Sequence, residues 1–115
     1  MNEHNHQKLV VLWFRATYPD LAAVFFAIPN GERRDPATAK RLQEEGVLAG
    51  VPDLLLAVPR GPLAGLFLEM KAVLGGRLSQ PQKAAHAALT AQGYAVAVAH
   101  GYEAAKAAIV DYLER

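Results

Sequence analysis

Apolar residues recur at three- and four-residue steps near the N-terminus. They are Leu9, Val10, Leu12, Trp13 and Ala16. This spacing places side chains on one face of an α-helix, and the proline at position 19 cannot continue a helix. The pattern therefore predicts an amphipathic helix over residues 2–18.

Apolar runs of strand length follow along the chain. Residues 22–28 form the first, which we interpret as a buried strand because it is continuously apolar and closed by a proline. Residues 53–58 and 65–71 are separated by Pro-Arg-Gly-Pro at 59–62. This is turn chemistry, so the two runs are expected to form a hairpin. Residues 94–99 form the last predicted strand.

Further helices are indicated by the residues at their ends. Asp35 followed by Pro36 is typical of a helix start, and Gly46 supplies a stop, so we expect a helix over residues 37–45. A last helix is expected over residues 102–113.

Another helix is predicted to begin at Ser79 and to end at Gly93. Its core-facing side chains are expected at helical spacing. They are Ala85, Ala88, Leu89 and either Ala91 or Gln92.

The predicted elements occur in the order α-β-α-β-β-α-β-α. We expect an α/β fold in which helices cover both faces of a small mixed sheet. With 115 residues, of which 52% are apolar and 20% charged, the chain fits one domain over residues 1–115 with a single core. A chain of this size can spare little room for a large internal cavity. The functional site is therefore expected to be a shallow surface cleft.

Charge and cysteine content exclude several classes of protein. Twelve Lys and Arg against eleven Asp and Glu give a formal charge of +1, far from the excess expected of a purely electrostatic nucleic-acid binder. The absence of cysteine excludes disulfides, thiolate metal sites and thiol catalysis. The sequence shows neither a bilayer-spanning apolar run nor a secretion signal. We therefore expect an intracellular, cytoplasmic protein that does not enter a membrane.

Three charged residues stand at the ends of otherwise apolar strands. Asp53 opens the first hairpin strand, and Glu69 and Lys71 close the second, so antiparallel pairing brings them to one end of the sheet. Glu69 and Lys71 share a face, with Met70 turned into the core. Carboxylates together with a backbone carbonyl and waters suit Mg²⁺ or Mn²⁺, and a lysine can hold a phosphate oxygen or an attacking water. The cluster indicates phosphodiester chemistry.

Here the sequence resembles a known group of nucleases. Pro52-Asp53, with Glu69-Met70-Lys71 sixteen residues after Asp53, is similar to the motif of the PD-(D/E)XK nuclease superfamily, and the expected strand order matches the core of that superfamily. Further positions resemble its VRR-NUC branch, the virus-type replication-repair nucleases, in a short stand-alone form. They are Glu3, Gln7, Ile-Pro-Asn-Gly at 28–31, Gly-Val-Leu-Ala-Gly-Val-Pro-Asp at 46–53, Leu78-Ser79 and Gln82.

The resemblance runs from Glu3 to about Tyr112 and implies a fold and an activity. The implied fold is a restriction-endonuclease-like core, and the implied activity is that of a Mg²⁺- or Mn²⁺-dependent DNA endonuclease. Stand-alone members are similar to Holliday-junction resolvases, which act on branched DNA as homodimers.

The resemblance also implies a metal site. Asp53 and Glu69 would be ligands, joined by the backbone carbonyl of Met70. Lys71 would position or activate the water and neutralise charge in the transition state.

Two more site residues follow from the resemblance, and each has a structural alternative. Gln82 matches a glutamine that faces the active centre from the next helix, but Ser79 and Gln82 also have the spacing of a capping box. Glu3 matches a first-helix glutamate that contacts the metal directly or through water; its structural alternative is that of a favourable anion in the first turn of a helix. The strand-end carboxylates could otherwise be solvated or ion-paired with the neighbouring lysine.

Four cations lie close together after the loop at 28–31: Arg33, Arg34, Lys40 and Arg41. Such a cluster can track a phosphate backbone. Alternatively, it is a solvated surface in which the later two pair with acids one helical turn on.

Other chemistry-bearing residues receive structural interpretations. We interpret His86, one turn after the glutamine at position 82, as a surface or supporting residue. Trp13, Phe25, Phe26 and Phe67 are interpreted as core residues.

For the whole chain, the alternatives to a junction nuclease are a non-catalytic DNA-binding or dimerisation module and a nicking or flap nuclease of the same fold. The interface of a homodimer stays unassigned, because its candidates are also needed for the core. They are Leu9, Trp13, Phe14, Ala105, Ile109, Tyr112 and Leu113.

Overall fold

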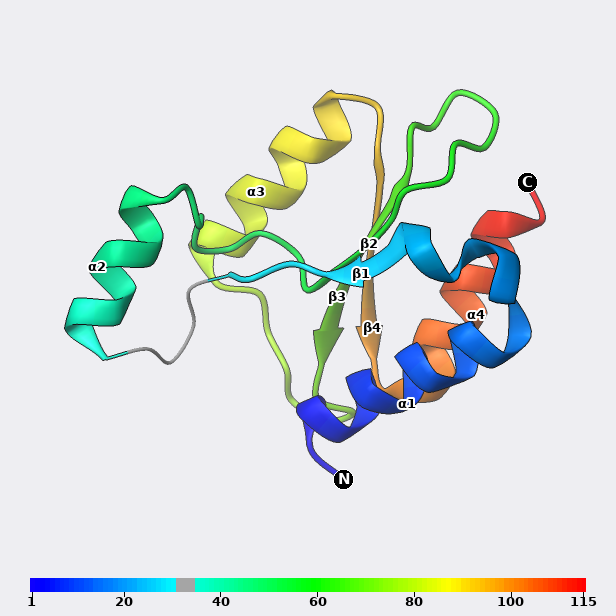
Figure 1. Ribbon diagram of the computed structural model, residues 1–115, viewed down its shortest axis with the longest axis horizontal. Helices are drawn as coiled ribbons and strands as arrows, with labels where there is room; N and C mark the ends of the chain where they lie inside the picture. Colours follow the sequence, from blue (N-terminus) through cyan, green and yellow to red (C-terminus); the bar gives the residue numbers. More distant parts are fainter. Residues whose placement is uncertain (31–34) are drawn as a thin grey trace.

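The computed structural model describes residues 1–30 and 35–115 (Figure 1). Its elements are α1 (Glu3–Thr17), the 3₁₀ helix η1 (Pro19–Val24), β1 (Phe25–Ala27), α2 (Pro36–Glu44), β2 (Leu54–Leu56), β3 (Leu66–Lys71), α3 (Gln80–Ala91), β4 (Ala95–His100) and α4 (Tyr102–Leu113). The strands lie in the order β1-β2-β3-β4. The first two pairings are antiparallel and the third is parallel. The predicted α/β fold with a small mixed sheet is confirmed.

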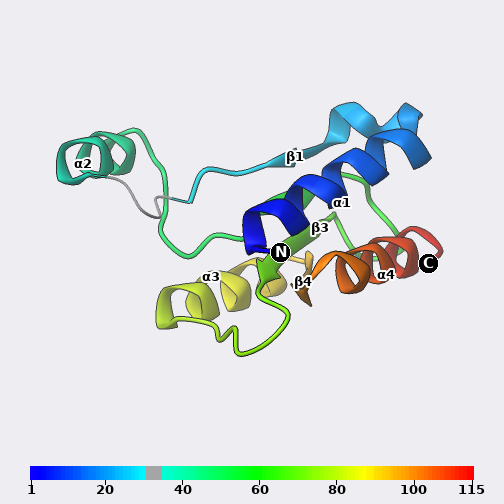
Figure 2. The same ribbon diagram turned by 90° about the horizontal axis from the view of Figure 1, so that it is seen from below.

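The helices lie on opposite sides of this sheet. Figures 1 and 2 show α1 and α4 side by side on one side and α3 on the other, while α2 lies apart from the sheet beyond β1. The parallel β3-β4 pair brings the C-terminal ends of both strands to the same end of the sheet. The antiparallel β2-β3 pair places the start of β2 at that end as well. Polar residues at that end therefore gather close to the start of α3.

Local signals explain where the helices begin. The Asp35 side chain accepts the backbone N–H of Thr38 at 3.0 Å, which confirms it as an N-cap. Ser79 and Gln82 form a reciprocal capping box at the start of α3, an arrangement that satisfies two otherwise unpaired amides. The boundaries of α4 agree with the predicted range of 102–113.

The core lies between the sheet and the α1-α4 pair. Its buried apolar residues come from both helices, from all four strands and from the segment after β2: Val10, Phe14, Phe25, Leu54, Leu56, Val58, Leu66, Leu68, Met70, Ala99, Ala105, Ile109 and Tyr112. The hydroxyl of Tyr112 donates to the backbone carbonyl of Val58 at 2.6 Å. This bond satisfies the one polar atom that Tyr112 brings into the core.

The predicted strand over residues 22–28 is much shorter than expected. Residues 19–24 form η1, and only Phe25–Ala27 pair with β2. An apolar run cannot by itself distinguish a strand from a helical turn. Here Leu21 and Val24 reach the core from the helical turn, so burial is achieved without extension.

Two predictions about buried faces are wrong, the first of them in part. On α3, Ala85 and Leu89 are half-buried, but the other predicted inner residues Ala88, Ala91 and Gln92 are exposed, and the buried residues are Gln82 and His86. On β1, Phe25 is 3% exposed but its neighbour Phe26 is 46% exposed, because successive strand residues point to opposite faces and α3 does not extend over this edge of the sheet (Figure 1).

Within the described part of the chain, no helix combines the length and apolarity that crossing a bilayer requires.

Candidate active site

Asp53 and Glu69 face each other across two neighbouring strands. The antiparallel register pairs Leu54 with Leu68, so continuing it by one residue places Asp53 opposite Glu69. The backbone N–H of Ile28 donates to the Asp53 carbonyl at 2.8 Å, which extends the β1-β2 ladder to the same row. Residues directly opposite each other share a face of the sheet. The two strand-end carboxylates are therefore brought together, as the hairpin prediction requires.

The Asp53 carboxylate is held in place at both oxygens. Oδ2 accepts the backbone N–H of Met70 at 2.7 Å, and Oδ1 accepts the Nδ2–H of Asn30 at 3.0 Å. The Asp53 carboxylate thus accepts the Met70 N–H that a backbone carbonyl would accept if β2 extended to this row. The contact from Asn30 was not predicted, although its loop at 28–31 was noted in the sequence.

Lys71, Gln82 and Glu69 form a connected polar group. The Nζ of Lys71 donates to Oε1 of Gln82 at 2.9 Å, and Nε2 of Gln82 donates to Oε2 of Glu69 at 3.4 Å. The same Oε1 accepts the backbone N–H of Ser79 at 2.9 Å. Gln82 therefore caps α3 and contacts the candidate site at once, so its two interpretations do not exclude each other.

His86 supports Glu69 from one turn further along α3. Its Nε2 lies 3.0 Å from Oε1 of Glu69, and both side chains are buried. Burial lowers the pKa of His86, and Lys71 lowers it further while Asp53 raises it, so the imidazole is neutral at neutral pH. Towards an ionised Glu69, which only accepts hydrogen bonds, Nε2 is the donor.

A glycine allows the segment before Asp53 to approach α3. Gly50 has φ of +93°, and a Cβ at this position would lie 2.4 Å from the backbone carbonyl carbon of Pro81. Any other residue would clash with the first turn of α3 and would adopt a disfavoured backbone conformation. This close contact sets the distance between Asp53 and the residues that α3 contributes.

Glu3 is not gathered with these carboxylates. It lies exposed in the first turn of α1, and no group of three or more His, Asp or Glu side chains in residues 1–30 and 35–115 is arranged to hold an ion. The start of α1 does lie against the end of the sheet, since His6 Nδ1 accepts the backbone N–H of Tyr102 at 2.9 Å. A metal contact from Glu3, direct or through water, stays a prediction.

The predicted basic cluster is only partly described. Arg33 and Arg34 lie outside the described residues. Lys40 and Arg41 are exposed on α2, and the Nε of Arg41 lies 4.0 Å from Glu45. An exposed ion pair of this length contributes little stability. The pair leaves the cations of α2 accessible to a partner.

The donor set fits a divalent ion of the magnesium class. Mg²⁺ and Mn²⁺ prefer oxygen ligands, and Asp53 and Glu69 supply carboxylates on one face. Opposed carboxylates repel each other unless a cation is near; Lys71 is one such cation, and a divalent ion would be another. Further ligands would come from water and from a backbone carbonyl such as that of Met70.

Comparison with known proteins agrees with the fold and with the resemblance. The family model described as "VRR-NUC domain" matches residues 2–103. A solved structure described as a "VRR_NUC domain protein" is 26% identical and superimposes with a TM-score of 0.83, covering 99% of this chain and 89% of the other. A search among curated proteins finds no match.

The mixed sheet with its helices and the matched family model make this a nuclease-type, DNA-processing domain. The chain belongs to the VRR-NUC domain family. DNA binding follows from that membership.

Proposed function

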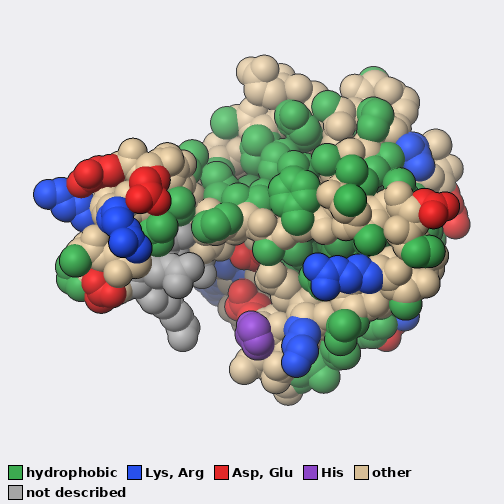
Figure 3. Space-filling model, viewed as in Figure 1, with side chains coloured by type: hydrophobic (Ala, Val, Ile, Leu, Met, Phe, Trp, Pro, Cys, Tyr) green, Lys and Arg blue, Asp and Glu red, His purple; other side chains and the backbone are tan. Residues whose placement is uncertain are grey.

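We propose that this chain is a Mg²⁺- or Mn²⁺-dependent DNA endonuclease whose active site contains Asp53, Glu69 and Lys71. The observation that carries the proposal is the placement of Asp53 opposite Glu69, with Lys71 held beside them by Gln82. Figure 3 shows acidic side chains in a hollow between α2 and the body of the molecule. Such a hollow suits the shallow surface site expected for a polymeric substrate.

In this proposal, each residue of the site has a role in holding the ion, the phosphate or another side chain. When bound by Asp53 and Glu69, the ion supplies Lewis acidity towards a phosphate oxygen and lowers the pKa of a water molecule. Lys71 lies beside the carboxylates and stabilises the negative charge that develops on the phosphate. Gln82 and His86 hold Glu69, which keeps the site preorganised before DNA binds.

The proposed substrate is branched DNA, such as a four-way junction. Contacts to phosphates and recognition of DNA shape would supply the selectivity, since the candidate site offers charged groups for phosphate rather than a surface for reading bases. Lys40 and Arg41 on α2, together with Arg33 and Arg34, would contribute phosphate contacts.

The proposed active form is a homodimer, because symmetric resolution of a junction needs two cuts and one chain carries one such site. Phe14, Ala105, Ile109 and Tyr112 are 0–2% exposed, so these candidates serve the core and are not available for an interface. Figure 3 shows apolar side chains gathered over the strands beside α3, but nothing identifies what covers them.

The test is cleavage of supercoiled plasmid, linear duplex and a synthetic four-way junction. We expect cutting with Mg²⁺ or Mn²⁺, none with EDTA, and paired symmetric cuts in the junction. A protein that binds DNA without cutting it under any divalent ion would contradict the enzyme proposal and favour a binding module.

Sedimentation equilibrium tests the assembly separately. A monomer that only nicks DNA would remove the dimer and the junction preference while leaving a simpler nuclease of the same fold.

A further inference from the structure

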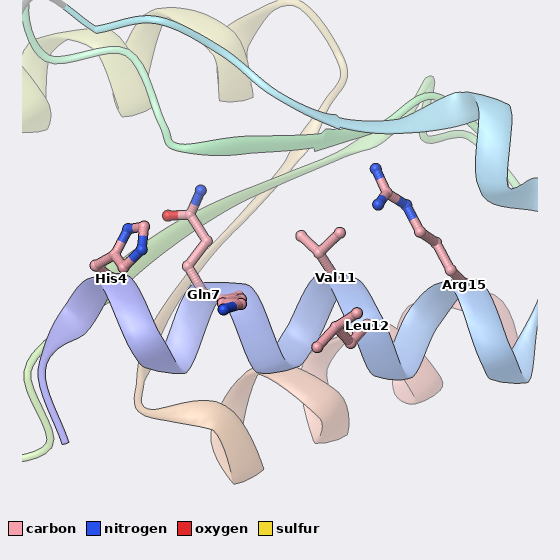
Figure 4. A pocket seen from close by; sticks show the side chains of 6 residues that line it. His4, Gln7, Val11, Leu12 and Arg15 are labelled. Atoms are coloured by element: carbon pink, nitrogen blue, oxygen red, sulfur yellow. The ribbon is translucent and has the colours of Figure 1, made fainter.

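A groove runs along the exposed side of α1. It encloses about 300 Å³ and is lined by His4, Gln7, Lys8, Val11, Leu12 and Arg15. These positions follow one another at helical steps, so they form one continuous stripe. Figure 4 shows the side chains of His4, Gln7, Val11 and Arg15 projecting from the same side of the helix.

The stripe carries two cations and two further hydrogen-bond donors beside the apolar Val11 and Leu12. Lys8 and Arg15 carry positive charge, and no ion pair within the described residues engages either of them. Gln7 and His4 add polar N–H groups. The single acid of α1 is Glu3, at the start of the helix. This surface therefore presents uncompensated positive charge to a partner.

We propose that this stripe binds the sugar-phosphate backbone of duplex DNA and extends the DNA path away from the candidate active site. The inference rests on the proposed nuclease function and adds to it a binding surface on α1. From His4 to Arg15 the helix rises about 16 Å, the axial length of roughly five phosphates of one strand. The stripe thus has the length to contact successive phosphates.

Its position favours DNA over an unrelated anionic partner. In the parallel register Lys71 pairs with His100. Two residues further along the chain, the backbone N–H of Tyr102 donates to His6 of α1. The stripe therefore begins at the end of the sheet where Lys71 lies. Figure 3 shows the hollow with its acidic side chains bordered on one side by α2 and, below it, by the purple and blue side chains over α1. DNA crossing the hollow would meet cations on both sides.

The test measures DNA affinity over a series of salt concentrations, with EDTA present so that the DNA stays intact. The variants are Lys8→Gln, Arg15→Gln and the double variant. The matched control is Arg115→Gln, which removes one exposed cation at the far end of α4, where its partner is Asp111. Thermal denaturation checks that each variant folds like the parent, as expected for exposed positions.

We expect each single groove variant to make the negative slope of log K against log salt shallower by about 0.9, and the double variant by about 1.8. Lys8→Arg should restore the slope, whereas Arg115→Gln should leave it unchanged. If the groove variants behave like the Arg115 control while the parent protein cuts DNA with Mg²⁺, the inference is wrong and the nuclease proposal stands. If the parent protein neither binds nor cuts any DNA, the nuclease proposal fails and the inference falls with it.

Discussion

The two faces of the sheet differ sharply along a single strand. In β3 the residues Leu66, Leu68 and Met70 face the α1-α4 pair and are 1–3% exposed. On the other face, Phe67 packs against Tyr94 with ring centroids 5.1 Å apart, while Glu69 and Lys71, nearer the end of the strand, face α3 and belong to the candidate active site. Because side chains alternate across a strand, one segment of six residues serves the fold on one face and carries the proposed chemistry at the end of the other.

The energetics of the two faces are also opposite. Burying a Leu or Met side chain contributes about 1.5–3 kcal/mol, whereas burying a polar group costs free energy unless it is hydrogen-bonded. Glu69, Gln82 and His86 are the buried polar residues of the described part of the chain, and they bond to one another. In that same part, every buried side-chain nitrogen and oxygen has a partner. The apolar face therefore offsets the cost of a polar, preorganised face.

The largest effect is expected from neutralising the carboxylates. Asp53→Asn or Glu69→Gln should lower the cleavage rate at least about a thousandfold, or roughly 4 kcal/mol, because each removes the charge of a proposed metal ligand while keeping its volume. Calorimetry with Mn²⁺ should show weakened binding. Asp20→Asn and Glu114→Gln, at exposed positions, are the matched controls and should cut normally. A Glu69 variant that cuts at the parent rate would remove Glu69 from the site.

The next effect concerns the opposite face of the same strand. Leu68→Ala, next to Glu69 in sequence but 1% exposed in the core, should lower the free energy of unfolding by about 2–5 kcal/mol. Urea denaturation measures this change. Cleavage per folded molecule at low temperature should stay close to that of the parent. A loss of activity out of proportion to the folded fraction would mean that the two faces are coupled.

His86 offers a finer test of the polar face. His86→Phe keeps a buried ring but removes the donor to Glu69, and should raise the Mg²⁺ concentration for half-maximal activity by about 10- to 100-fold, the range found for residues that orient metal ligands. Because its amide can still donate, His86→Gln should recover part of the loss. Equal Mg²⁺ dependence in all three proteins would limit His86 to a packing role.

Tyr112 gives a pH test of the apolar face. Burial raises the pKa of Tyr112, while Arg60 and Arg115 partly oppose the shift. The unfolded chain therefore loses this proton first as the pH rises, so stability should fall above about pH 10. Tyr112→Phe should flatten this dependence and cost about 1–2 kcal/mol at neutral pH, because it leaves the Val58 carbonyl without its donor. If the free energy of unfolding of Tyr112→Phe falls with pH as steeply as that of the parent, Tyr112 is not the group that causes the dependence.

Local sequence signals predicted most of the helices and the charged strand ends. The caps at Asp35 and Ser79 depend on neighbouring residues alone, and the spacing of Asp53, Glu69 and Lys71 needs only a hairpin. The extent of β1 was wrong because a continuous apolar run does not report its backbone conformation. The predictions of the helix caps and of the charged strand ends succeed because the contacts that determine them are close in sequence.

The supporting residues of the site depend on how α3 is rotated against the sheet. The sequence predicts that the alanines of α3 face the core, since apolar helix faces usually pack on the core. Gln82, Ala85, His86 and Leu89 have equally good helical spacing, but choosing that face requires knowing that it meets carboxylates. Asn30 is likewise placed by tertiary structure, twenty-three residues before Asp53 in the chain.

The smallest effect should come from the exposed edge of the α3 side. Phe25 and Phe26 are neighbours in β1, yet Phe25 packs on Phe14 with ring centroids 4.3 Å apart, and Phe26 is 46% exposed. Phe25→Ala should cost about 3–5 kcal/mol. Phe26→Thr, which keeps a strand-favouring residue, should cost about 1 kcal/mol or less, because only part of the ring is buried. Urea denaturation of the two variants compares the faces directly, and similar losses would show that the α3 side stabilises the fold as much as the core does.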